Sequence, residues 1–290
     1  MDKKTANKVS ILTVIINLFL SAVKFAVGII SHSQALVSDA VHSASDVVST
    51  IAVILGINLS LKKSDSSHPY GHERIECIFS VILSMMLFAT GIGIGLTAVR
   101  TIIYGNDIII PGKPALFAAV LSIAVKEWMY HYTKRCAVKI NSSSMMADAW
   151  HHRSDALSSI GSLIGIGGAI LGFPICEPVA SIIICIFIAK AAYDIFMDAV
   201  NRLVDRSCSE EEIEEIKNIV LEIDGVKRID NLMTRRFGSK VYVDLEIAQD
   251  GNLTLYQSHE TAEKVHDRIE EKIKDVKHCM IHVNPYIEKE

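Results

Sequence analysis

The sequence predicts a multi-pass α-helical membrane protein: six transmembrane helices followed by a small cytoplasmic α+β domain. Three observations support this fold class. Half of the 290 residues are hydrophobic and the mean hydropathy is positive, which is typical of chains that contain membrane spans. Six apolar stretches are long enough to cross a bilayer, and from about residue 201 they give way to shorter amphipathic segments rich in Glu and Lys.

The six stretches define the transmembrane part. A helix needs about 20 mostly apolar residues to cross a bilayer, and the stretches at 9–30, 35–61, 75–103, 114–131, 145–171 and 175–200 meet this requirement. The first is too long for the core of a signal peptide, so we interpret it as a retained span. Basic residues gather before the first span and after the second and fourth, whereas the alternate links carry only Lys113. By the positive-inside rule, both termini are cytoplasmic.

The C-terminal region has the pattern of a two-layer domain. Ser209 precedes three glutamates, as expected of a helix N-cap followed by an acidic first turn. The hydrophobic periodicity then predicts a helix to about residue 223, strands at 226–236 and 240–248, a helix at 255–274 and a strand at 280–283. The order αββαβ indicates a compact α+β domain. We therefore expect a six-helix transmembrane domain at 1–205 and a cytoplasmic domain at 206–290.

Charge and cysteine content exclude several classes of protein. A formal net charge of −4 argues against a nucleic-acid-binding protein, which is normally basic. The six cysteines are scattered and no two form a C-x-x-C pair, which argues against a disulfide scaffold or a zinc ribbon. We expect most of them to act as small buried hydrophobic residues.

An internal repeat carries the most specific chemical signal. Spans two and five both contain D-A-x-H-x-x-S-D-x-x-S, beginning at Asp39 and at Asp148. A histidine and an aspartate four residues later lie on one face of a helix. The two pairs are His42 with Asp46 and His151 with Asp155.

Two such pairs on facing antiparallel helices provide four ligands, which suits the tetrahedral preference of Zn²⁺. In that arrangement Asp46 lies level with His151, and Asp39 and Asp148 lie about one turn away, where they would guide ions or bond neighbouring helices. The alternative is a pair of structural hydrogen bonds, but carboxylates at mid-membrane cost about 2.5–3.5 kcal/mol each. Because imidazole must lose its proton to bind a metal, the same site would exchange metal ions for protons.

Two further groups contain possible metal ligands. In the link before span three, Asp65, His68 and His72 surround a Pro-containing turn; the alternative is a solvated loop. In the C-terminal domain, Asp230 and Asp244 lie near the strands. The histidines there are His259, His266, His278 and His282, which are also typical of an ordinary polar surface.

At these motifs the sequence resembles the cation diffusion facilitator family, from the first span to the last strand. The motifs that support the resemblance are the two H-x-x-x-D pairs, H-P-Y-G-H-E-R-x-E at 68–76, A-W-H-H-R-S-D-A-L-S-S at 149–159 and I-H-V-N-P at 281–285. The resemblance implies a Y-shaped homodimer that exports divalent metals by proton antiport. It also implies a ferredoxin-like cytoplasmic domain that binds regulatory metal. The chain has no long histidine-rich loop of the kind found in many eukaryotic zinc transporters, so we expect it in the inner (plasma) membrane of a bacterial cell.

Carried over residue by residue, the resemblance assigns three metal sites to this chain. It places the transport site at His42, Asp46, His151 and Asp155, and the inter-domain site at Asp65, His68 and His72. It places the cytoplasmic site at Asp230, Asp244, His259 and His282. Here the chain departs from the iron/zinc branch, because Asp230 and Asp244 stand where that branch has histidines and Asn284 replaces an aspartate.

The donor set favours zinc as both the transported and the regulatory ion. Two His with two Asp resemble the zinc- and cadmium-transporting branch, whereas manganese prefers oxygen ligands. Cobalt, cadmium and ferrous iron remain alternatives, because ligand softness and geometry alone discriminate poorly among these ions, and manganese is a further alternative. No nucleic acid is expected as a partner, only a second copy of the chain, the bilayer, metal ions and protons.

Two other classes of protein compete with a transporter. A membrane metalloenzyme would need an open coordination position for water, and the chain has no H-E-x-x-H motif, so we expect no enzymatic activity. A membrane-anchored metal receptor or scaffold would not need matched ionisable residues inside its anchor. Lys24 and Lys126 fall within or near spans, where we interpret them as snorkelling towards an interface, and Glu127 has no predicted role.

Overall fold

The computed structural model describes residues 3–30, 34–104, 113–170, 173, 175–273 and 275–286. Within these ranges, some side chains fall outside the description, at positions 3, 4, 28, 34–45, 48, 113–119, 158, 161, 162, 164–170, 176, 177 and 180. The chain divides into two compact units, Met1–Val200 and Asn201–Glu290. Each unit is described by itself.

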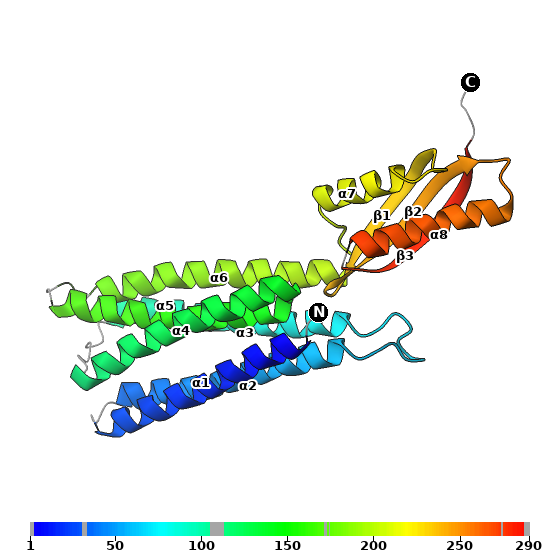
Figure 1. Ribbon diagram of the computed structural model, residues 1–290. Helices are drawn as coiled ribbons and strands as arrows, with labels where there is room; N and C mark the ends of the chain where they lie inside the picture. Colours follow the sequence, from blue (N-terminus) through cyan, green and yellow to red (C-terminus); the bar gives the residue numbers. More distant parts are fainter. Residues whose placement is uncertain are drawn as a thin grey trace. The chain divides into compact units, whose positions relative to one another are not determined.

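The first unit consists of six long helices (Figure 1). They are α1 (Lys3–Ile30), α2 (Gln34–Ser60), α3 (Arg74–Tyr104), α4 (Lys113–Ile140), α5 (Ser143–Ile170) and α6 (Cys176–Leu203), of which the last ends just inside the second unit. At a rise of about 1.5 Å per residue, helices of 27–31 residues exceed the roughly 30 Å of a bilayer core. Among the described residues, Thr5–Val27 and Arg74–Tyr104 also have the length and hydropathy of a membrane span.

The fourth helix is longer than the apolar stretch that predicts it. The sequence pattern ends at residue 131, but α4 continues to Ile140. Its last part contains Lys134 and Lys139, which end the apolar run without ending the helix. Buried Cys136 and Ala137 keep this part packed against the bundle.

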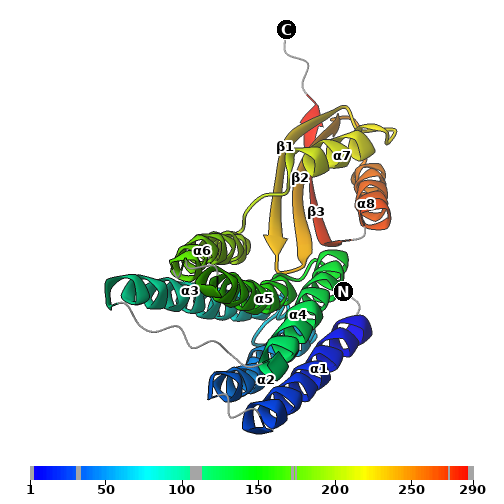
Figure 2. The same ribbon diagram turned by 90° about the vertical axis from the view of Figure 1, so that its left-hand side faces the viewer.

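Helix α5 is central to the packing of the first unit. It contacts α2, α3 and α4, and α1 packs along α2; Figure 2 shows the bundle from its end. The core contains Val53, Ile57, Leu87, Met145 and Ile188. Large apolar side chains cover the outside of the same helices, for example Phe19, Met85 and Phe187. In water such a surface would be an aggregation liability, and it suits a lipid environment.

The second unit is an αββαβ domain, in the order that the sequence predicts. Its elements are α7 (Glu210–Leu221), β1 (Arg228–Phe237), β2 (Lys240–Asp250), α8 (Leu255–Lys272) and β3 (Val276–Tyr286). Strand β2 is central, antiparallel to β1 and parallel to β3. Helices α7 and α8 pack against each other and against the sheet, which gives two layers (Figure 2).

Local signals explain most of the boundaries in this domain. Helices α7 and α8 both begin with a capping box, formed by Ser209 with Glu212 and by Thr254 with Gln257. A two-residue loop joins β1 to β2, and Gly238 adopts the positive φ of 62° that this turn needs. Strand β3 is longer than the predicted 280–283, because polar residues on its exposed positions obscure the alternation while its backbone pairs with β2 along nearly its whole length.

The cysteines of this domain are part of its core. Cys208 and Cys279 are buried in the cluster formed by α7, α8 and the sheet. Burial, followed by the nearby charges of Glu270 and Asp244, raises the pKa of the Cys279 thiol to about 12. A thiol with that pKa remains protonated near neutral pH and is a poor metal ligand.

Candidate metal sites

Three helices of the first unit bring four ionisable side chains together. Asp46 comes from α2, His151 and Asp155 from α5, and Lys126 from α4. Nε2 of His151 lies 3.2 Å from Oδ1 of Asp46. Nζ of Lys126 donates to Oδ2 of Asp46 over 2.6 Å and to Oδ2 of Asp155 over 2.9 Å. The cluster therefore holds two carboxylates, one imidazole and one ammonium.

The geometry of this cluster suits a small metal ion. One ligand atom from each of Asp46, His151 and Asp155 lies within 4.8 Å of the others. Ligands bound to one zinc ion at about 2 Å are at most about 4 Å apart, so a modest contraction would complete the arrangement. Asp46 is 1% exposed, and these atoms lie where helix packing, and not solvent, determines their positions. The antiparallel contact of α2 with α5 places Asp46 level with His151, as the repeat predicts.

His42 is the fourth residue of the predicted transport site. Its backbone lies on α2, four residues before Asp46, and its side chain is outside the described part of the chain. Asp39 also lies on α2, and its side chain is likewise outside the described part of the chain. The description therefore covers three of the four predicted ligands.

Lys126 was missed as a member of this site. The prediction that Lys126 snorkels to an interface is wrong: the side chain is 2% exposed and its ammonium bonds to both aspartates. The same prediction is wrong for Lys24, which is also 2% exposed. The available signal was a lysine in the middle of an apolar helix, because a charge at membrane depth nearly always faces the bundle interior and finds a partner. The sequence could not show which acids it meets, since 80 residues separate it from Asp46.

A second polar group lies beside the cluster, on the N-terminal side of α5. The hydroxyl of Thr50 donates to Oδ1 of Asp148 over 3.1 Å. Oδ2 of Asp148 accepts no hydrogen bond among the described residues, and Nε2 of His152 lies 3.6 Å from it. Both side chains are fully buried. His152 therefore does not join the ligand cluster of Asp46, His151 and Asp155.

Neighbouring Arg153 and Glu127 also lie outside the cluster. The guanidinium of Arg153 stacks over the ring of Tyr130, 4.4 Å from its centroid. Glu127 Oε1 lies 3.6 Å from Arg153 Nη2 and 3.2 Å from His131 Nε2. These contacts tie α4 to α5 at the surface of the bundle.

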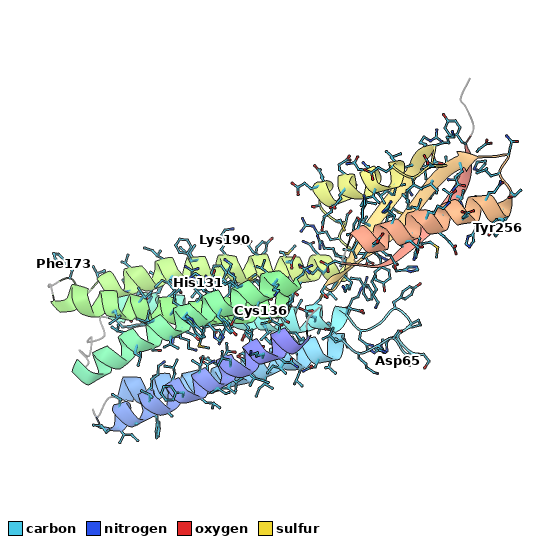
Figure 3. All side chains as sticks on the ribbon, in the orientation of Figure 1. Asp65, His131, Cys136, Phe173, Lys190 and Tyr256 are labelled. Carbon is cyan, nitrogen blue, oxygen red and sulfur yellow. The ribbon has the colours of Figure 1, made fainter. Side chains whose placement is uncertain are left out.

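The link between α2 and α3 brings Asp65, His68 and His72 together, as the sequence predicts. One ligand atom from each lies within 4.8 Å of the others. Oδ1 of Asp65 accepts hydrogen bonds from the backbone N–H groups of Ser67 and His68, at 3.1 and 2.9 Å. Nε2 of His72 lies 3.5 Å from Asp65 Oδ2, and its buried Nδ1 has no hydrogen-bond partner among the described residues. Figure 3 labels Asp65 at this link.

The charge of Asp65 is maintained by its neighbours. A hydrogen bond from Lys62, 2.7 Å away, is the largest cause that lowers the pKa of the Asp65 carboxyl, and the bonds from His68 add to it. The carboxylate therefore stays ionised well below neutral pH. Two imidazoles and an ionised carboxylate are suitable donors for a divalent transition metal.

The four residues predicted for the cytoplasmic site do not form a ligand cluster among the described residues of a single chain. His259 is exposed on α8 beside Glu263. Asp244 faces Met280 across the β2–β3 ladder, and His282 faces Glu246. The residues lie on different strands and on a helix, so their shared polarity does not bring them together.

A different polar group forms on this sheet. Nδ2 of Asn284 donates to Asp230 over 3.1 Å and to Glu246 over 3.2 Å. A hydrogen bond from Arg228 is the largest cause that lowers the pKa of the Asp230 carboxyl. Glu246 was missed from the sequence, where it reads as an ordinary exposed position of an alternating strand.

Comparisons with known proteins agree with this architecture. Residues 10–204 match the model of the cation efflux transmembrane domain, and residues 208–286 match that of the cation efflux protein cytoplasmic domain. The chain belongs to this family, the cation diffusion facilitators, whose members are membrane proteins that move metal cations. Its fold is that of the family: a helical transmembrane domain followed by a ferredoxin-like domain.

Individual relatives match over almost the whole chain. The manganese efflux system protein MneP of Bacillus subtilis (strain 168) is 33% identical over 99% of this chain and 98% of its own length. The magnetosome protein MamB of Magnetospira sp. (strain QH-2) is 34% identical over 93% of this chain and 92% of its own. Among solved structures, a cadmium form of the MamM C-terminal domain covers 27% of this chain and 98% of its own, with 22% identity and a TM-score of 0.27.

Proposed function

We propose that this protein exports divalent transition-metal ions from the cytoplasm in exchange for protons. The observation that carries the proposal is the convergence of Asp46, His151 and Asp155 from two helices inside an apolar bundle. His42 completes the proposed ligand set. Intramembrane carboxylates and imidazoles are costly to bury and mark ion pathways. In a family of cation efflux proteins, they are the natural place for the transported ion.

The chemistry of these donors supports coupling to protons. A metal binds the carboxylate and the neutral imidazole, so binding displaces any protons that these groups carry, and protons displace the metal in turn. A site that faces the two sides of the membrane alternately would then release metal where protons are abundant. His151 is the residue that we expect to release a proton to water when the ion binds.

Zinc is the first substrate that we propose, because a site with imidazole and carboxylate donors suits Zn²⁺. Manganese is the second candidate, and a specific observation favours it: MneP, whose name is that of a manganese efflux protein, matches nearly the whole chain. Manganese prefers oxygen donors, and two of the three described ligands are carboxylates.

The remaining proposals concern assembly and regulation. The chain would lie in the cell inner membrane as a homodimer, with both termini in the cytoplasm and residues 206–290 as the metal-sensing and dimerising domain. The link site of Asp65, His68 and His72 would bind a regulatory ion, zinc first. We propose no metal role for Asp244, His259 and His282 in one chain alone, and a second copy would be needed to complete a site there.

The test is metal uptake into proteoliposomes with an imposed pH gradient, for Zn²⁺, Mn²⁺, Fe²⁺ and Co²⁺. Wild type is expected to transport zinc or manganese only with the gradient, and Asp155→Ala is expected to abolish the flux. Asp194→Ala is the matched control, because Asp194 is exposed on α6 and pairs with Lys190. Flux that ignores the gradient would overturn the antiport. No flux for any ion, with metal binding retained, would favour a receptor instead.

A further inference from the structure

A buried ammonium bonds to one oxygen of each of the two carboxylates in the candidate transport site. Nζ of Lys126 lies 2.6 Å from Oδ2 of Asp46 and 2.9 Å from Oδ2 of Asp155. The side chain is 2% exposed. It enters the cluster from α4, a helix that supplies none of the predicted ligands.

We propose that Lys126 is a tethered cation, which holds the two carboxylates between transport events and must leave them before a metal ion binds. This inference rests on the proposed function, and it names a residue that controls how tightly and how fast the transport site takes its ion. The step is a change in the position of one charged side chain.

The shared oxygens make the ammonium and the metal competitors. A divalent ion within bonding distance of Asp46 and Asp155 would lie close to Nζ, and like charges repel strongly in a low-dielectric interior. A salt bridge with a purely structural role could use carboxylate atoms away from the candidate ligands. Here the lysine bonds to both acids of the ligand cluster at once.

A second carboxylate lies beside the transport site and could accept the withdrawn ammonium. Lysine carries its charge on a flexible four-carbon stem. Oδ2 of buried Asp148 accepts no hydrogen bond among the described residues. Thr50 links the other oxygen of Asp148 to α2, and the same hydroxyl lies 3.4 Å from the backbone oxygen of Asp46. An acceptor is therefore available beside the transport site when an ion takes the two aspartates.

The tethered cation has two consequences for transport. When the ion has left, the ammonium neutralises carboxylates that would otherwise be charged and unpaired at membrane depth. The protein can then change conformation with an empty site, so that the site faces the cytoplasm again. While it is in place, it also lowers the apparent affinity for metal, because only the fraction of molecules with the lysine withdrawn can bind. If that fraction is about one tenth, removing the lysine tightens binding about tenfold.

The experiment measures metal binding to the full-length protein in detergent, for wild type, Lys126→Met and Lys190→Met. Zn²⁺ and Mn²⁺ are the probes, and Asp155→Asn identifies the part of the binding that belongs to the transport site. We expect Lys126→Met to tighten that component about tenfold and to slow turnover in proteoliposomes. Lys190→Met is the control, because this lysine is exposed on α6 beside Asp194, and it should match wild type.

The sign of the change separates the tethered cation from a structural salt bridge. A structural lysine would leave two repelling carboxylates when removed, so binding would weaken or stay unchanged, and either result overturns the proposal. If the methionine variant does not fold, Lys126→Gln also removes the charge and is expected to tighten binding, and an unchanged affinity there overturns the proposal equally. Wild type without Asp155-dependent binding or flux would instead refute the proposed function.

Discussion

The hydroxyl of Thr50 on α2 donates a hydrogen bond to Oδ1 of Asp148 on α5, over 3.1 Å, inside the helical bundle. The two residues are 98 positions apart in the chain. Thr50 is fully buried and Asp148 is 1% exposed. The bond joins the two helices that carry the proposed ligands. Thr50 lies four residues after Asp46, and Asp148 lies three residues before His151.

Replacement of Thr50 by valine is expected to destabilise the protein. The change keeps the shape of the side chain but leaves a buried carboxylate oxygen without its donor, which costs about 1–3 kcal/mol. Thermal unfolding of the purified protein in detergent would show the loss as a lower Tm. Thr97→Val is the control, because the hydroxyl of Thr97 bonds only within its own helix at an exposed position. Equal Tm values for the two variants would contradict the importance of this contact.

The adjacent histidines of α5 should respond differently to alanine. His151 contacts Asp46, so we expect His151→Ala to remove metal binding at the transport site and to leave the fold intact. His152 is fully buried away from the ligands, so His152→Ala should leave a cavity that costs on the order of 1–3 kcal/mol and retain metal binding. Metal titration and thermal unfolding of both variants check the pair. If only the His152 variant lost metal binding, His152 and not His151 would be the metal ligand.

Asp65→Asn tests the link site with little change in its backbone. The amide oxygen can still accept the N–H groups of Ser67 and His68, so the turn should persist, but the charge that attracts a cation is gone. We expect metal affinity at this site to fall at least about tenfold, measured by titration in an Asp155→Asn background. Ser67→Ala is the control, since Ser67 contributes only its backbone N–H to Asp65. An unchanged affinity in Asp65→Asn would exclude the carboxylate as a ligand.

Acid should destabilise the C-terminal αββαβ domain through Glu212. Burial alone would raise the pKa of this carboxyl, but hydrogen bonds from Ser209 and the charge of Arg236, 2.6 Å away, outweigh it and lower the pKa. A group with a lowered folded pKa stabilises the fold above its unfolded pKa, and the contribution is lost as the pH falls through the folded value. Glu212→Gln should therefore be less stable at neutral pH, but by no more than about 1 kcal/mol, because the Glu212 side chain is 39% exposed and solvent screens its charge. The variant should also lose less stability on acidification.

Urea unfolding of the domain from about pH 7 to about pH 3 measures this difference. The matched control is Glu214→Gln, on the same helix, whose partner Lys217 is also at the surface. If Glu212→Gln and wild type lost equal stability on acidification, the contribution assigned to Glu212 would be refuted.

Most of the architecture could be predicted because it follows from periodic patterns. Apolar stretches predict the six helices, and Ser209 before three glutamates predicts the start of α7. The pairing of Asp46 with His151 follows from a repeat on antiparallel helices. Each of these signals is local, or is duplicated within the chain.

The features that escaped prediction depend on contacts between distant segments. The partners of Lys126 come from α2 and α5, and nothing near residue 126 indicates them. Glu246 joins Asp230 only through Asn284 on the neighbouring strand, so its role depends on the register of β3. The full length of β3 was hidden for a related reason, since backbone pairing with β2 defines the strand and its side-chain pattern does not.

The carboxylate of Asp46 divides its two oxygens between two helices: Oδ1 meets His151 on α5, and Oδ2 meets Lys126 on α4. An ion that binds through either oxygen competes with one of these attachments. Binding of an ion to Asp46 would therefore replace a contact of α2 with α5 or with α4. The same carboxylate oxygens hold the ion and connect the helices, so ion binding would also weaken the helix contacts that must change for the ion to be released.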